Sequence, residues 1–83
     1  MVAAYVLINT QPGSVGEAAQ RIVAIPGVRS VEAVTGPYDA IAYAEAGTSD
    51  ELGHLVVSEI QKVPGIQKTL TCLLVALEAA KAA

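Results

Sequence analysis

The turn at residues 35–39, just before the middle of the chain, constrains the fold more than any other stretch. Gly36 and Pro37 supply the backbone angles that a tight connection needs, and apolar runs lie on both sides of them. This pattern predicts a β-hairpin that joins a strand at residues 28–34 to a strand at residues 40–46. The parts of the chain before and after the turn look like two copies of one unit.

Each copy contains a strand, an amphipathic helix and a Pro-Gly pair that ends the helix. Ser14 and Thr48 each stand three residues before a glutamate, so both helices are predicted to begin with a capping box. The interval from Thr48 to Pro64 exceeds the interval from Ser14 to Pro26 by about one helical turn. The second helix should therefore be the longer one.

The remaining strands are predicted at residues 2–9 and 66–75. Residues 2–9 are apolar at odd and even positions, which is typical of a strand covered on both faces. Arg29 and Glu32 give the strand at residues 28–34 the charge of an edge strand. The order β-α-β-β-α-β predicts an α+β, ferredoxin-like fold. Its four-stranded antiparallel sheet has the strand order 4-1-3-2 and carries both helices on one face.

The chain, residues 1–83, is predicted to be a single domain, with a helix-prone but uncapped tail at residues 76–83. Hydrophobic residues make up 53% of the chain and charged residues 16%, which is more apolar surface than one small core can bury. Because the helices cover one sheet face only, the other face would be an apolar patch. We expect a homodimer with two sheets packed face to face, as in a dimeric α+β barrel, and further assembly.

Charge and cysteine content exclude several classes of protein. A net charge of −3 without any basic run argues against direct binding of nucleic acid. The single cysteine excludes an internal disulfide and suits a reducing compartment. No apolar run approaches the ~20 residues of a membrane span, and the N-terminus lacks the features of a signal peptide. We expect a cytoplasmic protein that does not bind membranes.

Isolated reactive residues have ordinary explanations. His54 lies off the apolar stripe of the second helix and has no second ligand nearby, which favours a surface residue over a metal ligand. Cys72 lies among leucines and is predicted to be a packed thiol. The helix dipole accounts for Asp50 and Glu51, and Glu78 has no partner for acid–base chemistry. The sequence predicts no catalytic residue, no metal and no cofactor.

Two groups of polar residues are candidates for a ligand site: Gly36, Tyr38 and Asp39 in the hairpin, and Thr69 and Thr71 on the last strand. Turn chemistry and β-propensity are the alternative explanations for these residues. In a dimer packed through its sheets, both groups could meet at a subunit boundary. Turn amides, the carboxylate and the hydroxyls could there hold the ammonium and carboxylate of a small zwitterion.

The whole chain resembles the C-terminal effector-binding domain, or RAM domain, of Lrp/AsnC-type transcriptional regulators. The resemblance covers roughly residues 2–76. The matching stretches are Ile25-Pro26-Gly27-Val28, Thr35-Gly36-Pro37-Tyr38-Asp39-Ala40, and Val63-Pro64-Gly65-Ile66 followed by Thr69-Leu70-Thr71.

This resemblance implies dimers formed through the sheets, rings that are commonly octamers, and an amino acid bound between dimers near the hairpin. It assigns Gly36, Tyr38 and Asp39 to the ligand site, with Thr69 and Thr71 as further members. The regulators carry a helix-turn-helix before this domain and the present sequence has none, so it looks like a stand-alone RAM protein.

We therefore expect a non-enzymatic amino-acid sensor that modulates Lrp/AsnC-type regulation and can co-assemble with full-length regulators. Replacing Asp39 by alanine should weaken the response to ligand and leave the fold intact.

Other functions stay open. An ACT-like regulatory module of the same topology would bind its ligand beside Gln11-Pro12-Gly13 and pair edge to edge. A small dimeric α+β-barrel enzyme, such as a cofactor-free monooxygenase, would need a pocket under the helices with His54 or a similar group. The aliphatic helix stripe argues against that enzyme. A pure assembly protein without a ligand is the remaining alternative.

Overall fold

The computed structural model describes residues 1–75, and its elements follow the predicted order. They are β1 (Val2–Thr10), α1 (Val15–Val23), β2 (Val28–Ala33), β3 (Ala40–Ala46), α2 (Ser49–Leu55), the π-helix η1 (Val56–Ile60) and β4 (Ile66–Leu73). Because η1 continues α2 directly, the second helical segment has 7 and 5 residues against 9 in α1, which confirms that it is longer. The predicted tail at residues 76–83 lies outside the described residues.

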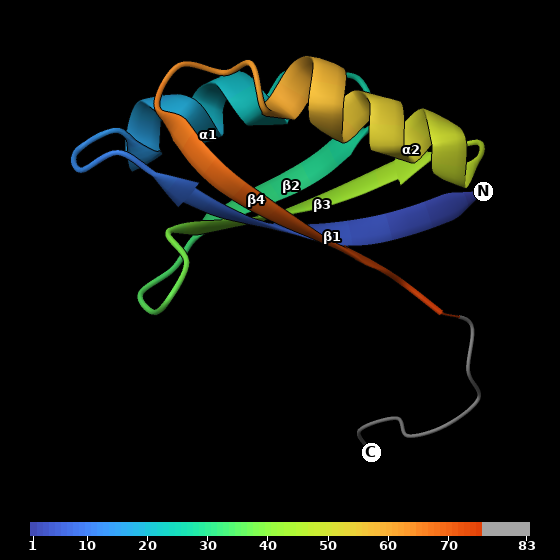
Figure 1. The fold of residues 1–83 in the computed structure, drawn as a ribbon, viewed down its shortest axis with the longest axis horizontal. Helices are drawn as coiled ribbons and strands as arrows, with labels where there is room; N and C mark the ends of the chain where they lie inside the picture. Colours follow the sequence, from blue (N-terminus) through green and yellow to red (C-terminus); the bar gives the residue numbers. More distant parts are fainter. Residues whose placement is uncertain (76–83) are drawn as a thin grey trace.

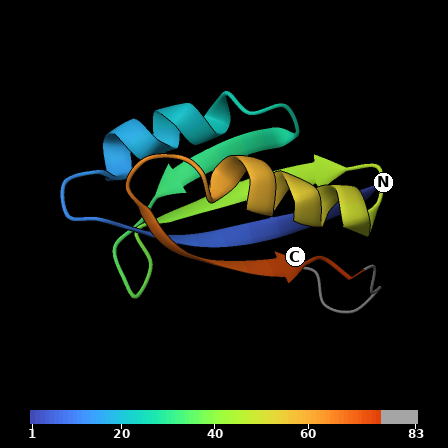
Figure 2. The ribbon, with the colours of Figure 1, turned by 45° about the horizontal axis from the view of Figure 1, so that its top comes forward.

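The sheet has the order β2-β3-β1-β4 with antiparallel neighbours throughout, which confirms the predicted order 4-1-3-2. Figures 1 and 2 show α1 and α2 side by side over one face of this sheet. Within residues 1–75, the opposite face carries no helix in either view. β2 and β4 are the edge strands, so the charged residues of β2 lie where the sequence placed them.

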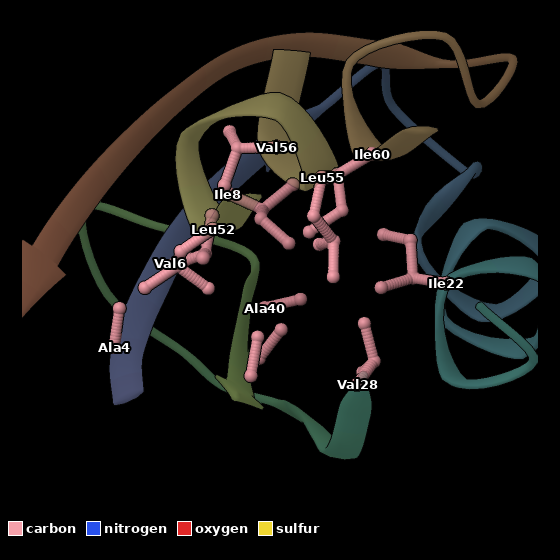
Figure 3. Close-up of a cluster of buried hydrophobic side chains, with 12 residues drawn as sticks. Ala4, Val6, Ile8, Ile22, Val28, Ala40, Leu52, Leu55, Val56 and Ile60 are labelled. Atoms are coloured by element: carbon pink, nitrogen blue, oxygen red, sulfur yellow. The ribbon is translucent and has the colours of Figure 1, made fainter. Parts of the chain in front are cut away.

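The core lies between the helices and the covered sheet face and consists of small and aliphatic side chains (Figure 3). Its members from the strands are Ala4, Val6, Ile8, Val28, Ala40, Ala42 and Ala44, and those from the helical segments are Ile22, Leu52, Leu55, Val56 and Ile60. Full burial of one such aliphatic side chain stabilises the fold by roughly 1.5–3 kcal/mol. The alanines of β3 leave the space in which both helices approach the sheet closely.

Both Pro-Gly pairs use their glycine in the same way. Gly27 has φ +100°, and a Cβ there would lie 2.7 Å from Cδ1 of Leu55. Gly65 has φ +94°, and its carbonyl accepts the N–H of Gln11 at 2.8 Å, just as the carbonyl of Gly27 accepts the N–H of Glu45 at 2.8 Å. The equivalent bonds support the view that the chain repeats one unit.

Only one of the two predicted capping boxes forms. The hydroxyl of Thr48 accepts the N–H of Glu51 at 3.1 Å, and Thr48 has the extended backbone of an N-cap. The prediction for Ser14 is wrong, since its side chain caps nothing. Ser14 has helical backbone angles (φ −99°, ψ −7°), and its Oγ would lie 3.2 Å from a Cβ at Gly65, so the side chain packs against the second repeat.

Two burial predictions are wrong for the single chain. β1 is covered on one face only: Val6 and Ile8 are fully buried, whereas Tyr5 is 44% exposed. Cys72, expected to be packed, is exposed. The reason is that Cys72 pairs with Tyr5 on the side of the sheet without helices, and β4 is an edge strand.

Within residues 1–75, no helix combines the length and the apolar character needed to cross a membrane.

Candidate functional site

The hairpin between β2 and β3 projects beyond the sheet, away from the helices (Figure 1). Its last residue, Asp39, holds it to β1. One carboxylate oxygen of Asp39, Oδ2, accepts the backbone N–H of Thr10 at 2.8 Å, with the Thr10 hydroxyl 3.5 Å away. The backbone N–H of Asp39 donates to the carbonyl of Ile8 at 2.8 Å, and Asn9 Nδ2 donates to the carbonyl of Pro37 at 2.9 Å. The turn is therefore anchored on a neighbouring strand at several points.

Asp39 keeps one oxygen for other partners. Among the hydrogen bonds of residues 1–75, its Oδ1 accepts none, and the Tyr38 hydroxyl takes part in none. Tyr38 is half-buried, whereas Gly36 is exposed, and a Cβ added at Gly36 would have no heavy atom within 4 Å. The hairpin thus offers a carboxylate oxygen and a phenol beside open space.

The two threonines lie elsewhere in the fold. Thr69 pairs with Ile8 and Thr71 pairs with Val6, so both are on the helix-facing side of β4. Thr71 is exposed, and the Thr69 hydroxyl accepts a hydrogen bond from Gln61 Nε2 at 2.8 Å. Because β1 separates β4 from β3, the strand that carries the threonines lies two strand spacings, about 10 Å, from the strand that follows the hairpin. The single chain brings Gly36, Tyr38 and Asp39 together but leaves Thr69 and Thr71 apart from them.

Thr69 belongs to a polar groove of about 380 Å³ at the start of β4. The groove is lined by Gln61, Ile66, Gln67, Lys68 and Thr69. Sequence reasoning missed Gln61 and Lys68. Their proximity follows from the turn at residues 61–65, which brings the end of η1 back beside the start of β4. No residue pattern in the sequence marks that contact.

The sheet face without helices, called the uncovered face below, combines an aromatic pair with aliphatic neighbours. Strand register and side-chain alternation place Ala3, Tyr5, Leu7, Ile41, Tyr43, Leu70 and Cys72 on it. The rings of Tyr5 and Tyr43 lie 5.3 Å apart between centroids, tilted by 54°. Leu70 is 46% exposed. This face is apolar across three neighbouring strands.

A charged group borders the uncovered face near β2. Arg29 Nε lies 2.9 Å from Glu45 Oε1, and the Tyr43 hydroxyl donates to Glu45 Oε2 at 3.3 Å. Burial of the phenol, and then the negative charge of Glu45, raise the pKa of Tyr43 above its usual value. The phenol is thus held in its neutral, hydrogen-bonding form at the rim of the apolar patch.

His54 is exposed, as expected, and its Nε2 lies 3.3 Å from the Ser58 hydroxyl. In the part of the chain that the structure describes, no three His, Cys, Asp or Glu residues are grouped closely enough to hold a metal ion.

Comparison with known families decides the class of the domain. The model of a family described as the Lrp/AsnC ligand binding domain matches residues 3–81. The chain belongs to this family. Its resemblance to the RAM domain, stated from the sequence, is confirmed. The curated relatives that match 82% of this chain are HTH-type transcriptional regulators.

An uncharacterised HTH-type transcriptional regulator of Pyrococcus furiosus is 34% identical to this RAM domain over 71 residues, which are 82% of this chain and 47% of the regulator. A regulator of Pyrococcus horikoshii is 32% identical over the same shares. The chain spans about half the length of these curated relatives. Homocitrate synthase of Sulfolobus acidocaldarius matches with 44% identity over 55 residues, 66% of this chain but only 12% of that enzyme.

Solved structures share the fold. The protein TTHA0845 of Thermus thermophilus has a TM-score of 0.88 and 31% identity, with coverage of 96% of this chain and 100% of that chain. The hypothetical protein PHS023 of Pyrococcus horikoshii has a TM-score of 0.84 and 32% identity, with coverage of 94% of both chains. The Neisseria meningitidis regulator NMB0573, solved as a complex with L-Met, has a TM-score of 0.82 and 18% identity, with coverage of 95% and 53%.

Proposed function

We propose that this RAM domain is a non-enzymatic amino-acid sensor that acts by assembling with copies of itself. The observation that carries the proposal is the uncovered face, because its apolar side chains lie beside a hairpin that projects in the same direction (Figure 1). Contiguous apolar patches of this kind mark interaction surfaces in proteins. The relatives that match 82% of this chain are transcriptional regulators, which supports a role in regulation over a role in catalysis.

The proposed dimer places the uncovered faces of two copies against each other. Tyr5 and Leu70 are 44% and 46% exposed in one chain, and such residues gain free energy when a second sheet removes them from water. Sheets packed face to face lie about 10 Å apart, which suits the aromatic pair of Tyr5 and Tyr43. Pairs of such dimers would then form a ring, for which an octamer is the expected size.

The proposed ligand is an amino acid bound at the hairpin, where dimers meet. Oδ1 of Asp39 is the acceptor for its ammonium group, and the Tyr38 hydroxyl and the amides around Gly36 are donors for its carboxylate. Thr69 and Thr71, which lie on β4 with β1 between it and β3, would join the site from a neighbouring subunit. The L-Met complex of the Neisseria regulator supports an amino acid as the class of ligand.

A ligand that binds between dimers shifts the equilibrium between separate dimers and the ring, because its affinity for these two states differs. By linkage, ring formation changes the affinity for the ligand by the same factor. Such a sensor could also co-assemble with full-length Lrp/AsnC regulators, since their RAM domains share its fold. We place it in the cytoplasm, with those regulators, and without DNA contacts of its own because its net charge is −3.

The test is a thermal-shift screen of the free amino acids, followed by light scattering of the protein with and without each compound that raises Tm. We expect one amino acid, or a few related ones, to raise Tm and to change the molar mass. A monomeric mass at micromolar concentration, together with no Tm response to any amino acid, would overturn the proposal. A bound ligand beside Gln11-Pro12-Gly13 would favour the ACT-like alternative.

A further inference from the structure

A second hollow lies in the helical layer, at the end of the β2–β3 pair opposite the hairpin. It is a groove of about 460 Å³ between the segment that follows α1 and the outer side of α2 and η1. Its lining residues are Ile25, Pro26, Glu51, His54, Leu55 and Glu59. No residue of the hairpin or of the uncovered face takes part, so the groove is independent of the proposed amino-acid site.

The groove combines apolar side chains with two carboxylates. Ile25 and Pro26 come from the connection between α1 and β2, and Leu55 rises from the core with 9% exposure. Glu51 and Glu59 stand eight residues apart on the continuous helical segment, with Leu55 midway between them. Since a helix rises 1.5 Å per residue, the backbone positions of Glu51 and Glu59 lie roughly 12 Å apart along the segment.

The charge of this groove is not balanced within the described chain. The ion pairs of residues 1–75 join Arg21 to Glu17 and Arg29 to Glu45, and neither involves a groove carboxylate. Glu51 accepts the Thr48 hydroxyl at 3.2 Å as part of the helix cap and takes part in no ion pair within residues 1–75. A cation is therefore the complementary occupant, and the apolar side chains favour one that carries methylene groups.

We propose that this groove binds a small aliphatic diamine. Its methylene chain would lie on Ile25, Pro26 and Leu55, and its ammonium groups would pair with Glu51 and Glu59. Ligand pockets commonly measure 300–1,000 Å³ and combine apolar walls with a few charged groups, as this one does. An aliphatic chain with an ammonium at each end matches the two negative charges and the apolar side chains that line the groove.

The experiment is an NMR titration of the whole chain with cadaverine, followed through the backbone amides of residues 51–59 and the His54 ring. We expect saturable shifts confined to these signals, and none with the corresponding neutral diol. Glu59→Gln should weaken the affinity about three- to five-fold, as expected for one partly exposed ion pair. Glu59 is exposed, so this substitution leaves the fold intact.

Glu17→Gln is the matched control, because it removes the same charge from the outer face of α1 and should leave the affinity unchanged. Equal weakening by Glu17→Gln and Glu59→Gln would show a diffuse charge effect and overturn the proposal, as would shifts that never saturate. Asp39→Asn should bind cadaverine like the wild type. The diamine site and the amino-acid site can therefore fail separately.

Discussion

The carboxylate of Asp39 accepts the backbone N–H of Thr10 at 2.8 Å, across 29 residues of sequence, and so fastens the hairpin to the end of β1. Thr10 is 7% exposed, so water cannot easily replace this acceptor. Asp39 therefore serves the fold through Oδ2, and its Oδ1 accepts no hydrogen bond within residues 1–75. This finding changes what substitutions at Asp39 should do.

Asp39→Ala should lower the free energy of unfolding by about 1.5–3 kcal/mol, since it leaves a buried N–H without its charged acceptor. The expectation that this variant leaves the fold intact is therefore revised. Asp39→Asn keeps an acceptor oxygen and should cost about 1 kcal/mol or less. Urea denaturation of both variants measures the difference. Equal losses in the two variants would show that the bond to Thr10 contributes little.

Asp39→Asn also separates the ligand role from the structural one. The variant retains the hydrogen bond to Thr10 but loses the negative charge proposed to hold an ammonium group. We expect it to stay folded and to lose most of the Tm rise that the cognate amino acid causes in the wild type. An unchanged affinity in calorimetry would remove Asp39 from the proposed site.

Tyr5→Glu should convert the protein to a monomer, because it puts a charge at the centre of the uncovered face. Light scattering at micromolar concentration measures the mass. Val57→Glu is the control, since Val57 is 59% exposed in the helical layer on the other side of the molecule. It should leave the mass unchanged. If Val57→Glu dissociates the protein and Tyr5→Glu does not, the helical layer is the interface.

Gly27→Ala should destabilise the protein by about 2 kcal/mol or more, because it forces a side chain into a left-handed backbone conformation. Its Cβ would also lie 2.9 Å from the carbonyl oxygen of Glu45. Gly53→Ala is the matched comparison, because Gly53 lies in α2 and a Cβ added there would have no heavy atom within 4 Å. It should stabilise by about 0.5–1 kcal/mol. Thermal unfolding should thus shift in opposite directions.

Tyr43 should make the free energy of unfolding depend on pH in the alkaline range. Its pKa is raised in the folded chain, so the folded state keeps the proton longer than the unfolded state does. The contribution is fully present below the unfolded pKa of about 10 and is lost as the pH rises through the folded pKa. Relative to Tyr43→Phe, the wild type should lose free energy of unfolding above pH ~10. Parallel curves for the two proteins would contradict this.

Much of the fold was predictable because its signals are local. The apolar run after the turn predicted a strand at residues 40–46, and the structure forms it and buries Ala40, Ala42 and Ala44. The position of Thr48 three residues before Glu51 identified a helix start that forms as expected. The hairpin at residues 35–39 was placed correctly for the same reason, since turn residues act on their own backbone.

The site was predictable only in part. Gly36, Tyr38 and Asp39 are close in space because they are close in sequence, but the partner of Asp39, Thr10, comes from another strand. The groove that joins Ile25 to Glu59 likewise depends on how two helical segments lie over the sheet. No short-range pattern reports such contacts.

Residue periodicity and the two Pro-Gly pairs were enough to predict the order of elements, because these signals act within a few residues. The sheet order and the face that the helices cover followed from the handedness of the connections. Chain packing settled the rest: that Asp39 is a structural acceptor, that Ser14 packs instead of capping, and that Cys72 is exposed. Those outcomes depend on strand register and helix placement, which join residues far apart in the chain through contacts that form only when the whole domain folds.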